Sequence, residues 1–118
     1  MAREKELPPP LEMACLNALW QLGEGNVEEV RGKVTVEKPL AYTTVLTLLE
    51  RLSKRGAVSR RKEGRGFRYR ATADHEKLRR IAVRQLLDNH FSGDAAAMQV
   101  FLQAPPAETE TLSIPLVP

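Results

Sequence analysis

The sequence predicts a mainly α-helical protein with one small β-hairpin, and three observations lead to this prediction. Three apolar patterns of helical period fill the first half of the chain, each bounded by a proline, a capping residue or a glycine. A basic stretch with central glycines and alternating aromatic residues follows them, which is typical of a hairpin. Two further apolar segments with helical spacing lie between residues 75 and 102.

The first helix is expected over Leu11–Leu22, since three prolines precede it and Gly23 follows it. Its apolar stripe consists of Leu11, Cys15, Leu19 and Leu22, with Leu16 and Trp20 beside it. Because Cys15 lies within this stripe, we expect it to be a small buried hydrophobic side chain and not a reactive thiol.

A short second helix is predicted over Val27–Val34. Asn26 can cap it, and Glu29, three residues later, can return the hydrogen bond, as in a capping box. Gly32 lowers the intrinsic stability of this helix by about 1 kcal/mol relative to alanine. Packing against the rest of the domain therefore has to hold the helix in place.

The third helix is predicted over Ala41–Arg55, and its two faces differ. The apolar face consists of Ala41, Val45, Leu48, Leu49 and Leu52. The opposite face is short, polar and uncharged near its start, at Thr43, Thr44 and Thr47. Short hydroxyl side chains allow close approach to another surface and can bond phosphates or base edges. The alternative interpretation is that Thr43 and Thr44 only serve the start of the helix.

The hairpin is predicted from two strands, Ala57–Arg61 and Phe67–Ala71, with the turn over 62–66. Aromatic residues alternate with arginines in the second strand, so one face is expected to pack and the other to be basic. Residues 51–70 carry a net charge of +8, whereas the other 98 residues carry −5. Charge concentrated in this way favours a nucleic-acid backbone as the partner over a solvated loop.

A fourth helix is expected over 75–91 and a short fifth one over 95–102, with Asp74 and Asp94 as caps. The fourth has apolar side chains on two opposite sides and the fifth has almost no polar face, so both need a further surface to pack against. We therefore expect a homodimer, with a single compact domain as the alternative. The expected dimerisation residues are Val83, Leu87, Phe91, Met98, Phe101 and Leu102.

These elements predict three regions along the chain. Three helices followed by a basic hairpin indicate a winged helix-turn-helix DNA-binding domain over 1–72. A helical dimerisation region is expected over 73–104, and a proline-rich, irregular tail over 105–118.

Several classes of function lack the residues that they require. Cys15 is the single cysteine, and His75 and His90 have no further ligands at metal-binding spacing, so we expect no metal site and no cofactor. No pairing of a nucleophile with a histidine is suggested, and we expect no catalytic residues and no enzymatic activity. The chain has neither an apolar run of membrane-spanning length nor a signal-peptide core, which predicts a soluble cytoplasmic protein without membrane insertion.

Two stretches, LEMACLNALWQLGEGNVEEV and LAYTTVLTLLERLSKRGAVSRRKEGRGFRYRA, carry a resemblance to a known family. With the Leu19-Trp20 helix end, the Ala-Tyr-Thr-Thr start at 41–44 and the Lys54-Arg55-Gly56 helix end, they resemble the penicillinase repressor (BlaI/MecI/CopY) family of bacterial transcriptional regulators. The resemblance covers about the first hundred residues. The chain departs from the family in its proline-rich tail, where members continue with another helix.

The resemblance implies a repressor that binds palindromic operator DNA as a homodimer, with the helix over 41–55 in the major groove and the hairpin on the backbone or in the minor groove. The DNA-binding residues expected from it are Tyr42, Thr43, Thr44, Thr47, Arg51, Arg60, Arg61, Lys62, Arg65 and Arg68. It also implies relief of repression through cleavage of the dimerisation region by a membrane sensor protease. A winged-helix protein-interaction module and an RNA-associated basic protein are the alternative functions.

Overall fold

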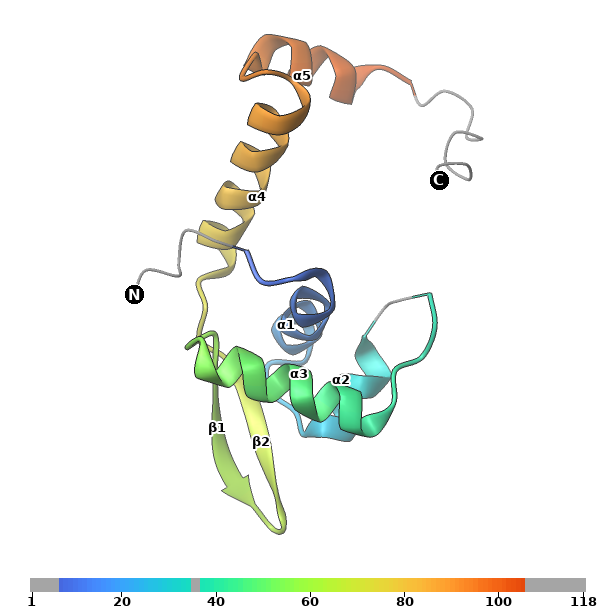
Figure 1. Cartoon of the computed structure of the whole chain (residues 1–118), viewed down its shortest axis with the longest axis vertical. Coiled ribbons are helices and arrows are strands. Elements are labelled where there is room, and N and C mark those ends of the chain that lie inside the picture. Colours follow the sequence, from blue (N-terminus) through green and yellow to red (C-terminus); the bar gives the residue numbers. More distant parts are fainter. Residues whose placement is uncertain (1–6, 35–36, 106–118) are drawn as a thin grey trace. The chain divides into compact units, whose positions relative to one another are not determined.

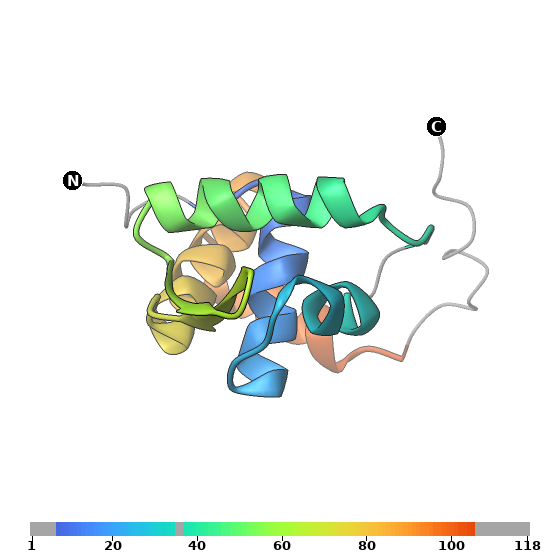
Figure 2. The ribbon, with the colours of Figure 1, turned by 90° about the horizontal axis from the view of Figure 1, so that it is seen from below.

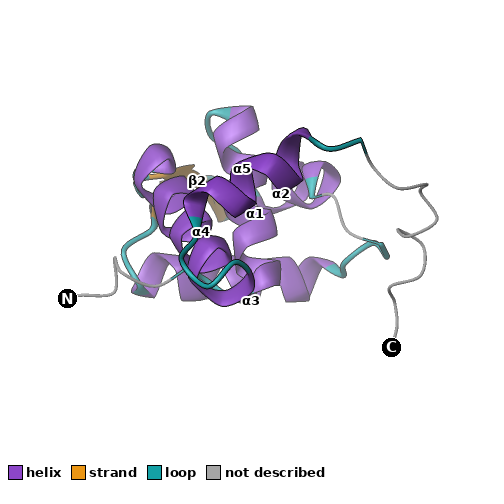
Figure 3. Cartoon of the chain, turned by 90° about the horizontal axis from the view of Figure 1, so that it is seen from above, coloured by secondary structure: helices purple, strands orange, loops and turns teal. Residues whose placement is uncertain are grey.

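Five helices and a two-stranded antiparallel sheet make up the computed structural model, which describes residues 7–34 and 37–105 (Figure 1). In chain order they are α1 (Pro10–Leu22), α2 (Val27–Lys33), α3 (Tyr42–Lys54), β1 (Val58–Glu63), β2 (Gly66–Ala71), α4 (His75–His90) and α5 (Ala95–Gln103). The two strands are a small part of a mainly helical structure (Figure 3). The predicted fold class is confirmed, and every helix begins and ends within one residue of its predicted bounds.

Internal contacts divide the chain into two units, residues 1–82 and residues 83–118, with the boundary inside α4. The first unit contains α1 to α3, the hairpin and the start of α4. The second contains the remainder of α4 and α5. The irregular tail expected over 105–118 lies, beyond residue 105, outside the described residues.

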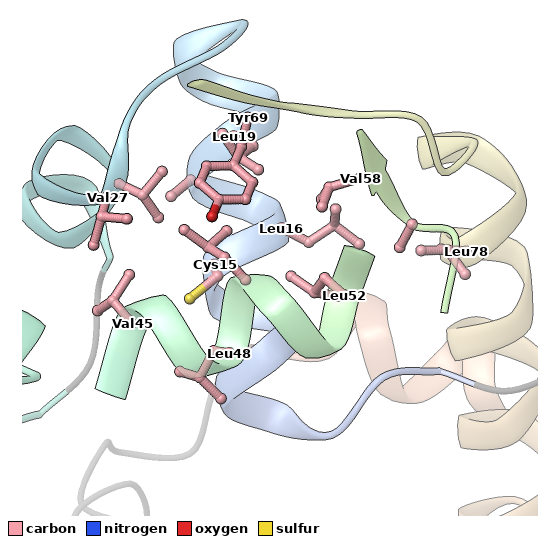
Figure 4. Packing of buried hydrophobic residues seen from close by; sticks show 14 residues of the cluster. Cys15, Leu16, Leu19, Val27, Val45, Leu48, Leu52, Val58, Tyr69 and Leu78 are labelled. Atoms are coloured by element: carbon pink, nitrogen blue, oxygen red, sulfur yellow. The ribbon is translucent and has the colours of Figure 1, made fainter. Parts of the chain in front are cut away.

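The core of the first unit lies where α1, α2, α3 and β2 meet (Figure 4). Seen from below, α3 crosses α1, with the hairpin and α2 on either side of α1 (Figure 2). The core residues are Cys15, Leu16, Ala18, Leu19, Val27, Val30, Val45, Leu48, Leu49, Leu52, Ala57, Val58, Tyr69 and Leu78. Tyr69 is the largest fully buried side chain, and Leu78 attaches the first turns of α4 to the same core. These contacts bury the predicted apolar faces of α1 and α3 together.

The structure corrects two positions of the predicted apolar faces. Leu11 is exposed, because Glu12 takes the inward position in the first turn of α1. The Oε1 atom of Glu12 accepts a hydrogen bond from Nη2 of Arg55 at 3.2 Å, and this ion pair satisfies the buried carboxylate. Ala41 is also exposed, since it is the extended N-cap residue of α3 and lies outside the helical face.

The predicted helix caps are confirmed. The backbone N–H of Glu29 donates to Oδ1 of Asn26 at 2.8 Å, and the N–H of Asn26 donates to Oε1 of Glu29 at 2.9 Å, which completes the capping box of α2. Asp74 accepts hydrogen bonds from the first turn of α4, and Asp94 accepts one from the N–H of Ala97 in α5. Local sequence signals therefore set where these three helices begin.

The hairpin has a tighter turn than predicted. Val58 pairs with Ala71, and the register continues to Glu63 and Gly66, so only two residues form the turn. Gly64 has a φ of 62°, which matches the first central position of a two-residue turn that suits the twist of the strands. The predicted five-residue turn is therefore wrong, because β1 extends two residues and β2 one residue further toward the tip than predicted.

A backbone bridge attaches the hairpin to the link between α1 and α2. The N–H of Gly25 donates to the carbonyl of Tyr69 at 2.9 Å, and the N–H of Tyr69 donates to the carbonyl of Gly25 at 2.8 Å. A Cβ atom on Gly25 would lie 3.2 Å from Leu22 and 3.3 Å from Glu29. A larger residue at this position would therefore require the side chains of Leu22 and Glu29 to shift.

Cys15 is fully buried, as predicted from its place in the apolar stripe of α1. Burial raises the pKa of the Cys15 thiol to about 11, and the nearby negative charge of Glu12 raises it further toward that value. The thiol is therefore protonated and shielded in the folded protein at neutral pH, which makes it unreactive.

We expect Cys15 to resist thiol reagents until the domain unfolds. Because the folded pKa lies above the unfolded value of about 8.5, the thiol favours the fold below that pH, and the contribution is lost as the pH rises through about 11. The measurement is Ellman's reaction at pH 8 with and without denaturant, with Cys15→Ala as the blank. Rapid labelling of the native protein would contradict the buried position.

Candidate nucleic-acid interface

The outer face of α3 is exposed along its whole length. Val45, Leu48, Leu49 and Leu52 point into the core, so the opposite side of the helix is available for contacts. The predicted residues Tyr42, Thr43, Thr47 and Arg51 are all exposed, and Thr44 is half-buried. α3 therefore presents short hydroxyl side chains at its N-terminal half and basic ones, Arg51 and Lys54, near its end.

The pleat of the hairpin sorts its side chains onto two faces. Residues that are paired across the strands share a face, and neighbours along a strand alternate. One face carries Val58, Arg60, Lys62, Phe67, Tyr69 and Ala71, and the other carries Ser59, Arg61, Glu63, Arg68 and Arg70. The five predicted basic residues of the hairpin are thus divided between the two faces and the tip, where Arg65 lies.

The face that was expected only to pack is also basic toward its tip. The guanidinium carbon of Arg60 lies 4.1 Å from the centroid of the Phe67 ring, and Nζ of Lys62 lies 5.9 Å from it. Cation–π contacts of this kind hold a charged group over an aromatic face without neutralising it. Phe67 is partly buried against the core, and its ring also holds two cations on the face of the buried Tyr69.

The opposite face is held by carboxylates. Nη1 of Arg61 donates to Oε1 of Glu24 at 2.9 Å. Arg68 lies 3.1 Å from Glu29, 3.5 Å from Glu24 and 3.6 Å from Glu63. Three of these ion pairs connect the hairpin to Glu24 in the link between α1 and α2 and to Glu29 in the first turn of α2, and the fourth, Arg68–Glu63, joins the two strands.

The pKa values of two groups reflect this network. The hydrogen bond from Arg61 lowers the pKa of Glu24 below its ordinary value, and the positive charges of Arg61 and Arg68 outweigh the opposing effect of desolvation. Desolvation lowers the pKa of Arg68, but the carboxylates of Glu29, Glu63 and Glu24 outweigh it and raise the pKa above the ordinary arginine value. Both groups therefore remain charged across the physiological pH range.

The remaining hairpin cations have no acidic partner in the part of the chain that the structure describes. Arg60, Lys62 and Arg65 are exposed, and no carboxylate of residues 7–34 or 37–105 forms an ion pair with them. Ion pairs with Glu24, Glu29 and Glu63 instead engage Arg61 and Arg68. The positive charge available to a polyanion therefore lies at the Phe67 face and the tip of the hairpin, and Arg70 adds one exposed cation on the opposite face, away from the tip.

A groove runs between α3 and the hairpin. Its lining from α3 consists of Tyr42, Leu46 and Glu50, and the hairpin contributes Arg60, Glu63, Arg65, Gly66, Phe67 and Tyr69. The N-cap and first residues of α2, at 26–28, complete the lining. Sequence reasoning missed Glu50 and Phe67 as members of this surface. The four-residue steps from Tyr42 through Leu46 would have identified Glu50, and the strand register, which puts Phe67 on the same face as Arg60, would have identified Phe67.

The histidines and the cysteine contribute no metal site within the described residues, where no group of three metal-ligating side chains occurs. His75 instead stacks on Trp20, with ring centroids 3.8 Å apart and planes 10° apart, which attaches the start of α4 to α1. None of the described helices is long and apolar enough to cross a membrane.

The second unit leaves apolar side chains exposed. Val83, Phe101 and Leu102 of the predicted dimerisation set are exposed, and Leu87, Phe91 and Met98 are half-buried. The rings of Phe91 and Phe101 lie 5.7 Å apart and hold α5 against the end of α4. An apolar hollow between the two helices is lined by Leu86, His90, Phe91, Phe101 and Leu102.

Comparison with known proteins decides the family. Residues 9–113 match the penicillinase repressor family. The chain belongs to this family. The resemblance drawn from the sequence is therefore confirmed, and the assignment agrees with the expectation of a regulator that is not an enzyme.

Curated relatives match part of this penicillinase repressor family member. It is 35% identical to the transcriptional regulator BlaI of Mycobacterium tuberculosis over 69 residues, which is 58% of this chain and 50% of the relative. It is 26% identical to the penicillinase repressor of Bacillus licheniformis over 87 residues, or 74% of this chain and 68% of the relative. The chain thus spans about half the length of the first of these curated relatives.

A solved structure confirms the winged helix-turn-helix fold. The solution structure of the DNA-binding domain of the repressor BlaI is 27% identical to this chain, with a TM-score of 0.54. The match covers 65% of this chain and 93% of that domain. The matched part of this penicillinase repressor family member therefore has the fold of that DNA-binding domain.

We expect Glu24→Gln to flatten the acid dependence of stability. Because the folded pKa of Glu24 is depressed, its carboxylate stabilises the fold above the unfolded pKa of about 4.3, and this contribution is lost as the pH falls through the folded value. The free energy of unfolding in urea, measured between about pH 6 and pH 3, should fall less steeply in the variant. Parallel curves for the wild type, Glu24→Gln and the exposed control Glu37→Gln would contradict the role of this ion pair.

Proposed function

We propose that this chain is a transcriptional repressor that binds double-stranded operator DNA. One observation carries the proposal: α3, whose outer face is rich in hydroxyl side chains, shares a groove with a hairpin whose Arg60, Lys62 and Arg65 have no acidic partner among the described residues. Membership of the penicillinase repressor family and likeness to the DNA-binding domain of BlaI support it. A polyanion is the partner that such a surface favours.

In this proposal α3 enters the major groove and reads bases. Its N-terminal side chains are small enough for the helix to approach base edges closely, and their hydroxyl groups can donate to or accept from bases and phosphates. The predicted reading residues are Tyr42, Thr43, Thr44 and Thr47. Arg51, one turn beyond Thr47, is suited to a phosphate beside the groove.

The hairpin supplies affinity that depends on salt and little on sequence. Arg60, Lys62 and Arg65 are the side chains that would neutralise phosphates or enter the adjacent minor groove. Arg61 and Arg68 have the second role of anchoring the hairpin through Glu24 and Glu29. A phosphate would have to compete with these carboxylates, so we assign Arg61 and Arg68 smaller shares of the binding energy.

The finer part of the proposal concerns assembly and relief. A homodimer that joins the exposed apolar side chains of the second unit would place two copies of α3 on a palindrome and would exclude polymerase from a promoter. Cleavage in this region by a membrane sensor protease, as the family resemblance implies, would separate the copies and weaken binding. This proposal places the protein in the cytoplasm.

The proposal is tested by isolating genomic fragments that the purified protein binds and by footprinting them. A palindromic protected sequence upstream of a gene is expected. Competition with RNA of matched length separates the RNA-associated alternative, since a duplex reader should retain its DNA in excess RNA. Failure to prefer any duplex over random competitor, even at low salt, would exclude the proposed function and favour a protein-interaction module.

Arg65→Ala and Thr44→Ala should weaken DNA binding in different ways. Loss of the tip cation should weaken binding to every sequence and reduce the slope of log K against log salt by about 1. Loss of the Thr44 hydroxyl should weaken cognate binding by about 1–3 kcal/mol more than random binding. The measurement is a fluorescence anisotropy titration at several salt concentrations, with Arg80→Ala on α4 as the control. If Thr44→Ala weakened binding to cognate and random DNA equally, Thr44 would not be a base-reading residue.

Phe101→Asp should dissociate the proposed homodimer. A carboxylate at this exposed apolar position would be buried without a partner in the interface, which is strongly unfavourable. Sedimentation velocity should show a shift toward the monomer, whereas Gln99→Asp on the exposed surface of the same helix should leave the assembly unchanged. Circular dichroism checks that α5 remains folded, and a monomeric wild type at micromolar concentration would contradict the dimer.

A further inference from the structure

Glu50 is an exposed acidic residue on the proposed DNA-reading helix. Tyr42, Leu46 and Glu50 are four residues apart, so they form one edge of α3, and all three line the groove beside the hairpin. Within residues 7–34 and 37–105 the carboxylate of Glu50 forms no ion pair. This holds although Lys54 lies one turn further along α3 and Arg60 lines the same groove.

The other acidic side chains around the hairpin differ from Glu50 because they are paired. Glu24, Glu29 and Glu63 all contact Arg68 at 3.1–3.6 Å. Glu28, which lines the same groove as Glu50, pairs with Arg31 at 3.2 Å. These four carboxylates are neutralised by the fold, so Glu50 alone among the groove's described acidic residues keeps a charge directed at an incoming ligand.

An unpaired carboxylate is unfavourable against the DNA backbone, because it repels phosphates. An ionised carboxylate only accepts hydrogen bonds, so it becomes favourable only where the ligand supplies a donor. In the major groove the donors are the N4 amine of cytosine and the N6 amine of adenine. In adenine the acceptor N7 lies next to the amine, and this nitrogen repels a carboxylate oxygen. Cytosine presents its amine without an adjacent acceptor on the same base.

We propose that Glu50 is a specificity-determining residue that accepts a hydrogen bond from the N4 amine of a cytosine in the operator. This inference rests on the proposed function of α3 as the helix that enters the major groove. Glu50 acts in two ways: it attracts the cytosine amine, and it rejects guanine and thymine, whose O6 and O4 atoms are acceptors. Its repulsion of phosphates also lowers binding to unrelated DNA.

The experiment is selection from a random duplex library with the full chain and three variants, followed by affinity measurements on the selected site. Glu50→Ala removes the acceptor, Glu50→Gln keeps one acceptor oxygen and adds a donor, and Glu28→Gln changes the charge of the same groove by the same amount. Circular dichroism and the unfolding midpoint establish that each variant is folded. Replacement of the preferred cytosine pair by a thymine pair completes a double-mutant cycle with Glu50→Ala.

The wild type should prefer cytosine at one position of each half-site, by about fivefold or more. Glu50→Ala should lose that preference and bind random DNA more tightly, and Glu50→Gln should shift it toward adenine. Glu28→Gln should bind all DNA slightly more tightly with the preference unchanged. An unchanged preference in Glu50→Ala, or a loss of preference in Glu28→Gln, would overturn the inference while leaving the proposed function intact. A wild type that selects no sequence would overturn the proposed function itself.

Discussion

The arrangement of the first unit depends on the burial of Tyr69. Its ring is fully enclosed in the core (Figure 4). Both of its backbone hydrogen-bonding groups pair with Gly25. A two-stranded hairpin has little stability of its own in water. Because Tyr69 attaches β2 to α1 and to the start of α2, the hairpin becomes a fixed part of the domain, and its position beside α3 is set by the same core that holds the helices.

Burial of Tyr69 also sorts the charge of the hairpin. Neighbours along a strand point to opposite faces, so Arg68 is directed away from the core toward Glu24 and Glu29. Arg60 and Lys62 share the face of Phe67, where the described residues offer an aromatic ring and no pairing carboxylate. One face of the hairpin is therefore used to anchor it, and the other keeps its charge beside the groove at α3. A binding surface needs both the anchored face and the charged face, since binding through a mobile hairpin would cost the conformational entropy of ordering its backbone.

The two units differ in how completely they bury their apolar residues. In the first, α1, α2, α3 and β2 enclose a continuous core, and Leu11 and Tyr42 are the large hydrophobic side chains that stay exposed among its described residues. In the second, α5 leaves Val100, Phe101 and Leu102 exposed at 64–68%. Exposed apolar side chains gathered on one short helix indicate a surface that associates with another. The proposed homodimer therefore rests on the exposed apolar side chains of α5 as well as on the family resemblance.

The sequence alone determined the order and type of the elements and the bounds of the helices, because caps, prolines, glycines and apolar spacing act within a few residues. The +8 segment and the threonine-rich face of α3 were also predictable, since composition and period define them. Only the tertiary structure decided which cations are neutralised, that Glu12 and not Leu11 faces inward, and that Glu50 lines a groove with Phe67. These outcomes depend on residues distant in sequence, such as Glu24 with Arg61 and Glu12 with Arg55, which meet only when the core brings their elements together.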